Sequence, residues 1–469
     1  MIGRIPRRMA RALPWQQSRD SSADLIAAMP SPGGPRPDVT NEPVTSQTFR
    51  AFRNRNYRLY YIGQTISLSG TWMQTIAQAW LVLQITNSKI ALGTVTMLQF
   101  LPITIFVLFA GVIADRVPKR NFILCTQALA MSQAFVLAVL VWSGNVELWH
   151  VYVLAFTLGL ANAFEQPTRQ AFVVEMVGKE DLMNAVALNS GMFNAARLIG
   201  PAIGGFVIAT IGVKGAFLLN GISFIPVIAG LLMMDTSKFY ATNANPNAST
   251  VPMGALAELR EGLRYAFHTP AALLIIILVA IIGTFGYNFT VMLPLLDRYV
   301  LGGGSVALGF LTAAVGLGAL ISALSLASRK SASRNTMFFG GAAFALLLGA
   351  VAISQWLVVT LVFLLLLGIA NTAFAATANT SLQLATPDHL RGRVMSLYML
   401  LFAGSTPIGG YLTGVMAQHL GVSMAIGIEA ALCAVGVAAG LLYFFSHRAQ
   451  VIATADVPVG RPANERVTA

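Results

Sequence analysis

Four charged residues stand inside long apolar stretches of the sequence, where an ionisable side chain is costly and is commonly functional. Glu165 and Arg169 are four residues apart, so on a helix they share one face and can pair. Arg197 needs an acidic partner, and Glu165 is the nearest acid by depth. We therefore predict an Arg197–Glu165 pair that breaks on protonation or on solute binding, with a purely structural ion pair as the alternative. Glu429, in the last apolar stretch, is a further candidate for moving a proton.

Neutral polar residues form a stripe along the first apolar stretch. They recur at steps of three and four, the spacing of one helix face: Gln64, Ser67, Thr71, Gln74 and Gln78. Lipid cannot satisfy an amide, so the stripe must face protein or water. We expect it to line a cavity, with hydrogen bonding between helices as the alternative.

The stretch GVIADRVPKR, residues 111–120, concentrates charge between two apolar runs. A cationic turn of this kind is expected on the cytoplasmic side of a membrane. Asp115 could accept hydrogen bonds from the free N–H groups of a helix starting near residue 391. Lys119 or Arg116 could reach Glu175. We predict a gate that holds two halves of the protein together, made of Gly111, Asp115, Arg116, Lys119, Arg120 and Glu175.

The composition is that of a membrane protein. Of 469 residues, 56% are hydrophobic and 10% are charged, and the mean hydropathy is +0.70. The net charge of +12 is spread over short loops and the N-terminal tail, which favours topology signals over nucleic-acid binding. Cys125 and Cys433 lie in apolar segments and are expected to be small buried hydrophobes. No phosphate-binding loop, hydrolase motif or metal cluster is visible, so neither a cofactor nor an enzyme is predicted.

Twelve apolar segments, each near the length of about 20 residues that crosses a bilayer, predict an all-α membrane protein. Cations alternate between successive loops, which places both termini in the cytoplasm if the helix count is even. The segments are 58–84, 91–114, 120–142, 149–174, 182–210, 215–234, 270–297, 305–328, 334–353, 356–383, 391–418 and 421–446.

These segments divide into two six-helix halves, 49–234 and 270–446, that echo each other weakly. GPAIGG, starting at Gly200, matches TPIGG, starting at Thr406. Between the halves, residues 235–269 predict a cytoplasmic linker with an amphipathic helix at 254–268 on the membrane surface. Residues 1–48 and 447–469 predict cytoplasmic tails, the first of them disordered.

The stretch at 111–120 is similar to the loop signature G-x-x-x-D-x-x-G-[RK]-[RK] of the major facilitator superfamily, with Pro118 in place of the second glycine. The segments AFRNRNYRLYYIGQTISLSGTWMQ, FEQPTRQAFVVEMV and LRGRVMSLY resemble the enterobactin-exporter-like branch. A second signature, similar to one in drug–proton antiporters, ends on Gly200, Pro201, Gly204 and Gly205. Small residues at this spacing also serve close helix packing alone.

The resemblance implies the major facilitator fold, with a cavity lined by the first, fourth, seventh and tenth segments. It implies that Asn162, Tyr287, Asn288, Asn371 and Asn379 face this cavity, although packing between helices explains each equally well. Such neutral groups suit an uncharged or weakly charged organic solute. The last segment would lie at the periphery, where snorkelling or an intersubunit contact competes with coupling for Glu429.

The resemblance further implies a monomeric, multi-pass exporter of the inner (plasma) membrane. It would move a small organic molecule, such as a siderophore, drug or metabolite, out of the cell in exchange for protons. The alternatives are an importer or facilitator of the same fold, and a membrane scaffold or sensor. One departure bears on coupling, since Ala155 stands where many proton-coupled members carry an arginine.

Overall fold

The computed structural model describes residues 49–240, 253–327 and 334–448. Within these ranges the side chains of 107–112, 114–116, 253–259, 327, 334 and 388–389 lie outside the described part. Every regular element described is helical, as the sequence predicts, and no strand occurs among these residues. The predicted tail at 1–48 and residues 449–469 of the predicted tail at 447–469 lie outside the described residues, as does the linker stretch 241–252.

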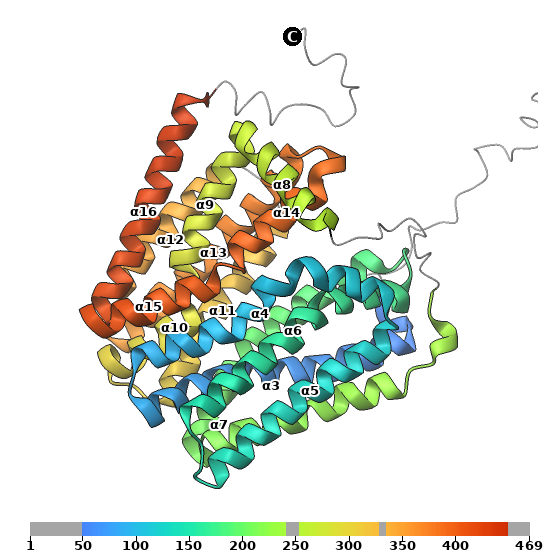
Figure 1. Ribbon diagram of the computed structural model, residues 1–469. Helices are drawn as coiled ribbons and strands as arrows, with labels where there is room; N and C mark the ends of the chain where they lie inside the picture. Colours follow the sequence, from blue (N-terminus) through green and yellow to red (C-terminus); the bar gives the residue numbers. More distant parts are fainter. Residues whose placement is uncertain (1–48, 241–252, 328–333, 449–469) are drawn as a thin grey trace, which may run out of the picture. The chain divides into compact units, whose positions relative to one another are not determined.

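The helices of residues 50–238 form one group (Figure 1). α3 packs along α7, α4 packs along α6, and α5 contacts both α6 and α7. The bounds are η2 Arg50–Arg53, α3 Arg55–Thr86, α4 Lys89–Arg116, α5 Lys119–Trp142, α6 Leu148–Val177, α7 Leu182–Leu232 and η3 Thr236–Lys238.

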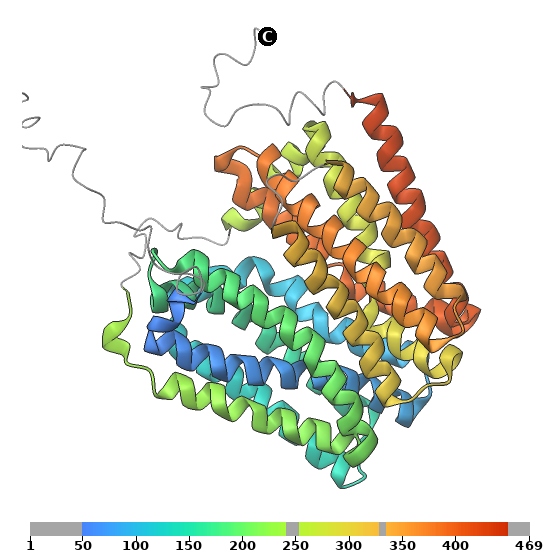
Figure 2. The same ribbon diagram turned by 180° about the vertical axis from the view of Figure 1, so that it is seen from behind.

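The helices of residues 253–446 form a second group, seen from behind in Figure 2. α13 packs against α11 and α12, and α16 packs against α12 and α9. The bounds are α8 Met253–His268, α9 Pro270–Gly286, α10 Phe289–Leu296, η4 Asp297–Leu301, α11 Ser305–Ala327, α12 Arg334–Ile353, α13 Leu357–Ala385, α14 Asp388–Phe402, α15 Thr406–Leu420 and α16 Val422–Ser446.

The turn between α3 and α4 shows how local sequence sets the helix boundaries. α3 ends at Thr86, and the following residue, Asn87, adopts a left-handed backbone conformation (φ 49°) that asparagine tolerates better than most residues. The next residue, Ser88, accepts the Ala91 N–H and so caps the start of α4. Two residues therefore reverse the chain between two long helices.

α7 contains two of the predicted segments in one continuous helical assignment of 51 residues. At about 1.5 Å per residue this length exceeds twice the thickness of a bilayer core. Gly212 interrupts it with φ 76° and ψ 176°, a conformation open to glycine and not to other residues. The break falls between the predicted segments 182–210 and 215–234.

Two segments predicted as continuous, 270–297 and 391–418, are each broken near the middle. α9 gives way to α10 at Tyr287 and Asn288, where the Asn288 side chain donates to the Thr284 carbonyl and competes with the helical backbone bond. α14 ends at Phe402, and Pro407 in the first turn of α15 has no N–H with which to continue the ladder. Hydropathy does not register either break because apolar residues continue across both.

α8 matches the predicted amphipathic helix and packs against α14 and α9. Glu261 and Arg393 of α14 form an ion pair of 2.6 Å, and the Tyr265 hydroxyl donates to the Ala385 carbonyl at 2.6 Å. Phe267, by contrast, is 66% exposed. The helix is therefore attached to the second group by these polar contacts and by the packing of Leu263 and Ala266 in the core, and it presents an aromatic ring outward.

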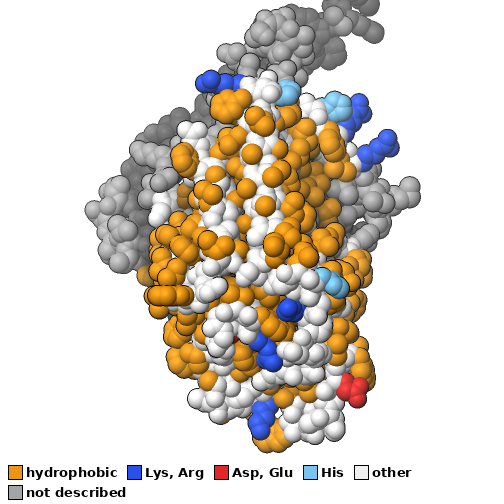
Figure 3. All heavy atoms as spheres, turned by 90° about the vertical axis from the view of Figure 1, so that its left-hand side faces the viewer, with side chains coloured by type: hydrophobic (Ala, Val, Ile, Leu, Met, Phe, Trp, Pro, Cys, Tyr) orange, Lys and Arg blue, Asp and Glu red, His pale blue; other side chains and the backbone are white. Residues whose placement is uncertain are grey.

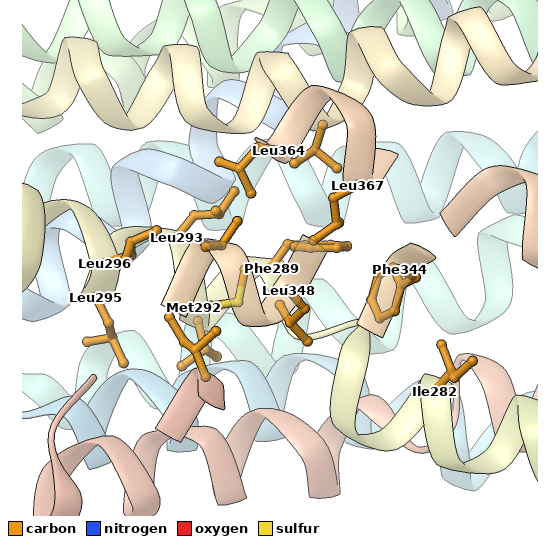
Figure 4. Packing of buried hydrophobic residues seen from close by; sticks show 14 of the residues in the cluster. Ile282, Phe289, Met292, Leu293, Leu295, Leu296, Phe344, Leu348, Leu364 and Leu367 are labelled. Carbon is orange, nitrogen blue, oxygen red and sulfur yellow. The ribbon is translucent and has the colours of Figure 1, made fainter. Parts of the chain in front are cut away.

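The core of the second group surrounds the short helix α10. Figure 4 shows Leu293 of α10 near Leu364 of α13, with Met292 close to Leu348 of α12. Phe289 and Phe344 meet edge to face, 6.5 Å between ring centres. Burial of these side chains holds α10 in place although it has eight residues, too few for a stable isolated helix.

The outer surface is apolar in the manner of a membrane-embedded protein. Figure 3 shows hydrophobic side chains covering most of one face, with Lys and Arg towards its top and in its lower part. In the described part of the chain, nine helices are long and apolar enough to cross a membrane. α3 and α6 are not among the nine, because their polar side chains lower the hydropathy. Cys433 is buried as predicted. Cys125 is exposed on the outer surface of the protein, so its predicted burial is wrong.

Candidate functional site

A cavity of about 300 Å³ lies between the two groups of helices. Both groups contribute to its wall, and the described lining contains one acid and two arginines. The polar and aromatic lining residues are Gln64, Ser67, Thr71, Trp72, Thr75, Gln99, Phe100, Gln127, Asn162, Glu165, Gln166, Arg169, Phe193, Arg197, Phe224, Tyr287, Phe289, Thr290, Thr312, Phe402 and Thr406.

Glu165 on α6 is the acid, and it is only 7% exposed. Its Oε1 accepts a hydrogen bond from Gln127 Nε2 of α5 at 2.9 Å. Arg169, one turn along α6, places NH1 4.0 Å from the same oxygen. The carboxyl group therefore has a neutral hydrogen-bond donor and a cation as its neighbours beside the cavity.

Arg197 of α7 does not pair with Glu165 as the sequence analysis predicted. Its NH1 lies 3.4 Å from the Tyr287 hydroxyl, at the break between α9 and α10. Its guanidinium also faces the rings of Trp72 and Tyr287, at 5.8 and 5.9 Å from their centres. Glu165 is engaged by Arg169 of its own helix instead. Depth along the membrane suggested Glu165 as the partner of Arg197. Depth does not specify on which side of the cavity each side chain lies.

The polar stripe of α3 divides between the cavity and the helix interfaces. Gln64, Ser67 and Thr71 line the cavity. Gln78 instead donates to Gln99 of α4 at 3.0 Å, and Gln74 donates to Gln133 of α5 at 2.9 Å. A straight α-helix has 3.6 residues per turn, so side chains that repeat every 3.5 residues rotate about the helix axis by about 20° per heptad. The stripe therefore turns away from the cavity along its length. The stripe therefore contributes both to the cavity wall and to the helix interfaces.

Gln74 belongs to a buried amide network that ties three helices together. Asn220 of α7 donates to Gln74 Oε1 at 2.6 Å, while Gln74 donates to Gln133. Asn220→Leu leaves the Gln74 carbonyl without its donor, and we expect a loss of about 1–2 kcal/mol in stability. The measurement is thermal unfolding in detergent. Asn194→Leu on the same helix, where the amide bonds to its own helix at Ser190, should change little, and equal destabilisation by both would contradict the prediction.

The polar residues predicted in the later segments are placed unequally. Tyr287 lines the cavity, as does Asn162 of α6. Asn288, Asn371 and Asn379 are absent from its described wall. Asn379 accepts a hydrogen bond from Gln383 at 2.6 Å, and Asn371 is 3% exposed within α13. Of these three, Asn288 contacts another helix, at Glu429 of α16, whereas the Asn379–Gln383 bond lies within α13.

Glu429 of α16 is 1% exposed, so the predicted snorkelling or intersubunit role is wrong. Thr413 of α15 donates to its Oε1, and Asn288 donates to the same oxygen at 3.4 Å. The group lies between α10, α15 and α16 and does not line the cavity. Apolar flanking residues gave no sign that this carboxyl faces the protein interior.

The predicted gate is described only in part. The side chains of Gly111, Asp115 and Arg116 lie outside the described residues. Lys119 Nζ is 2.8 Å from Glu175 Oε1, and Arg120 donates to the Leu231 and Leu232 carbonyls at 2.6 and 3.1 Å. All of these residues belong to the first group of helices. The Lys119–Glu175 contact therefore joins α5 to α6 and does not hold the two halves together.

The small-residue motif of α7 faces two directions. Cβ atoms at Gly200 and Gly204 would lie 2.5 Å from the Ser69 carbonyl and 2.9 Å from Ile76, both on α3. A Cβ at Gly205 would lie 2.6 Å from the Ser305 carbonyl of α11, in the other half. Pro201 also reaches this contact, because a Cβ at Gly309 of α11 would lie 2.7 Å from its carbonyl.

A second close contact joins α4 to α15. A Cβ at Gly93 would lie 2.8 Å from the Gly410 carbonyl, and one at Gly414 would lie 2.7 Å from the Lys89 carbonyl. Gly410 belongs to the TPIGG sequence that echoes GPAIGG. We call the α7–α11 and α4–α15 contacts the two glycine seams. The matched sequence motifs of the two halves thus occupy matched places between them.

Aromatic and charged residues join the two groups of helices at one end. Tyr299 of η4 donates to the Asn87 side chain at 2.8 Å, and Lys89 lies over the Tyr299 ring at 4.6 Å. Arg298 lies 6.0 Å from the centre of the Trp80 ring of α3. We call this the Tyr299 end, and the opposite one, where α7 ends and α8 follows, the linker end. Trp72, next to Thr71 of the α3 stripe, lines the cavity, and its position in the sequence is the signal that could have identified this part of the wall.

Comparison with known proteins assigns the family. The model of the transmembrane secretion effector family, a family of the major facilitator superfamily, matches residues 46–459. The chain is 29% identical over 370 residues to the multidrug efflux pump Tap of Mycolicibacterium fortuitum, covering 76% of this chain and 87% of that protein. It is 26% identical over 369 residues to the staphyloferrin A transporter of Staphylococcus aureus, covering 78% and 90%.

Solved structures agree on the fold. The nucleoside transporter NupG (D323A mutant) superposes with a TM-score of 0.65 at 12% identity, over 83% of this chain and all 100% of that one. The POT family transporter PepTSo superposes with a TM-score of 0.64 at 14% identity, over 85% of this chain and 99% of that one. The resemblance inferred from the sequence is confirmed. The matching family and relatives are transporters and not enzymes, as the sequence analysis predicted. The chain belongs to the transmembrane secretion effector family of the major facilitator superfamily, and it is a multi-pass membrane transporter.

Proposed function

We propose that this transporter is a secondary active exporter, which moves a small organic solute out of the cell in exchange for protons. The observation that carries the proposal is the cavity between the two groups of helices, with a single carboxyl in its described wall. Glu165 is nearly buried and lies beside Arg169, so a proton and a bound solute can compete at one place. The efflux function named for the relative from Mycolicibacterium fortuitum supports the outward direction.

The topology we propose has twelve crossings in the inner membrane and both termini in the cytoplasm. α7 supplies two crossings around Gly212, and each broken pair, α9 with α10 and α14 with α15, supplies one. α3 and α6 also cross, with their polar faces turned to the interior. Arg391 and Arg393 near the linker end favour a cytoplasmic location for that end.

Alternating access follows from the placement of the contacts. Tyr299, Asn87 and Lys89 tie the two groups together at the Tyr299 end, away from the linker end. The glycine seams let helices of opposite halves slide closely, since no side chains separate their backbones. Opening at the Tyr299 end would require the Tyr299–Asn87 bond to break. A monomer contains all of these parts.

Inverted membrane vesicles provide the direct test. With an imposed pH gradient, acid inside, we expect vesicles containing the protein to accumulate its substrate at least about tenfold over vesicles without it, without ATP. The screen covers siderophores and lipophilic drugs as radiolabelled solutes. Collapse of the gradient by a protonophore should abolish the accumulation.

The same assay separates the other transport modes. Solute movement that does not depend on the pH gradient identifies a facilitator. Solute accumulation only in right-side-out vesicles identifies an importer. Either result would replace the proposed function. The absence of transport for every solute class, in protein that is folded and inserted, would favour a scaffold or sensor.

A further inference from the structure

Arg197 is a charged residue of the cavity wall whose described contacts include no carboxylate. Its contacts are the Tyr287 hydroxyl at 3.4 Å and the rings of Trp72 and Tyr287. The acid of the described wall, Glu165, is engaged elsewhere by Gln127 and Arg169. Its guanidinium carries a full positive charge, and this charge faces the cavity.

These contacts leave the Arg197 charge incompletely compensated. Cation–π contacts at nearly 6 Å offset only part of the cost of a charge inside a membrane. A guanidinium has five N–H donors, and the Tyr287 hydroxyl engages one of its nitrogens. The remaining donors are suited to a planar oxyanion, which arginine binds with two parallel hydrogen bonds.

The surroundings of Arg197 also specify the rest of a ligand. Trp72 and Phe193 meet edge to face with ring centres 5.9 Å apart, and Tyr287 packs on Phe402 at 5.0 Å. Two arginines against one glutamate give the described wall a formal charge of +1. A ligand matched to this wall therefore joins an acidic group to a flat apolar body.

We propose that the solute bound in this cavity is an organic anion, with its carboxylate or similar oxyanion on Arg197 and its apolar part on Trp72, Phe193 and Tyr287. This inference rests on the proposed function, because it names the substrate class of the same cavity. It is more specific than the uncharged or weakly charged solute expected from the sequence. Neutral groups such as Tyr287 suggested that expectation, whereas the structure places Arg197 beside Tyr287 with no carboxylate among its described contacts.

The test measures equilibrium binding to the full-length protein in lipid nanodiscs, with tritiated probes of matched shape. Naphthylacetate carries a carboxylate, naphthylethanol is neutral and naphthylethylammonium is cationic. We expect the wild type to bind naphthylacetate about 10- to 100-fold more tightly than naphthylethanol. Arg197→Gln should remove this preference by weakening the binding of naphthylacetate alone. Arg197→Lys should retain part of the preference.

The matched control is Arg393→Gln, an arginine that pairs with Glu261 away from the cavity and should leave all three affinities unchanged. Equal binding of acid and alcohol by the wild type would overturn the inference. Tighter binding of the ammonium, survival of the preference in Arg197→Gln, or no naphthylacetate binding at millimolar concentration would also overturn it. If Arg197→Gln does not fold, the three affinities of the wild type and those of Arg197→Lys still decide whether the cavity prefers the anion.

Failure of this inference and failure of the proposed function are distinguishable. The binding constants are measured without a gradient, so they depend neither on direction nor on protons. Anion preference without gradient-driven export would contradict the exporter alone. Gradient-driven export of a neutral or cationic solute, with no anion preference, would contradict the inference alone.

Discussion

Glu165→Gln is expected to abolish coupling to the pH gradient while leaving solute binding and exchange in place. Glutamine keeps the size of the side chain and an oxygen that can accept from Gln127, which lies 2.9 Å away. It removes the single carboxyl of the described cavity wall. Proteoliposomes should show gradient-driven accumulation lowered by about tenfold or more, whereas exchange of labelled for unlabelled solute without a gradient continues.

Glu429→Gln is the matched comparison, because Glu429 is a second buried glutamate in a helix of the other half. Its partners are Thr413 and Asn288, and it does not line the cavity. We expect this variant to retain gradient-driven accumulation. If Glu429→Gln uncouples transport and Glu165→Gln does not, the protonation site lies between α10, α15 and α16, and our assignment of Glu165 is wrong.

The sequence predicted which residues enter the membrane far better than which neighbours they meet. Hydropathy ended the predicted segments within a few residues of the observed helices, as for 120–142 and α5 (Lys119–Trp142). The reason is that transfer from water to lipid depends on the local run of side chains. The breaks at Asn288 and Pro407 escaped prediction because they arise from backbone hydrogen bonds and not from polarity.

The rotation of each helix about its axis is a property of packing and was the main source of error. Gln64 and Gln78 belong to one stripe, yet only Gln64 reaches the cavity. Glu165 and Arg197 both line the cavity, but Arg169 and Tyr287 are their respective neighbours. Lys119 and Glu175 do meet, although within one half. Charge and spacing identify candidate pairs, while the helix arrangement decides among them.

Rocking of two halves requires an interface that is close and yet free to move. The glycine seams supply both properties, because backbones meet there without interlocked side chains. Ser305 adds one hydrogen bond across the α7–α11 seam, donating to the Gly205 carbonyl at 3.1 Å. The seams join the two halves, whereas the Lys119–Glu175 pair lies within one half, so we expect any relative movement of the halves to depend on the seams.

Gly205→Val is accordingly expected to stop transport while insertion into the membrane continues. The added Cβ would lie 2.6 Å from the Ser305 carbonyl and 3.0 Å from the Val306 Cα, so backbone must shift. Overpacking of this kind costs about 1–3 kcal/mol, which should lower both the melting temperature in detergent and the transport rate. Gly191→Val is the control on the same helix, since a Cβ there meets no atom within 4 Å. Equal transport by the two variants would show that the α7–α11 seam tolerates separation, and that movement of the halves does not depend on it.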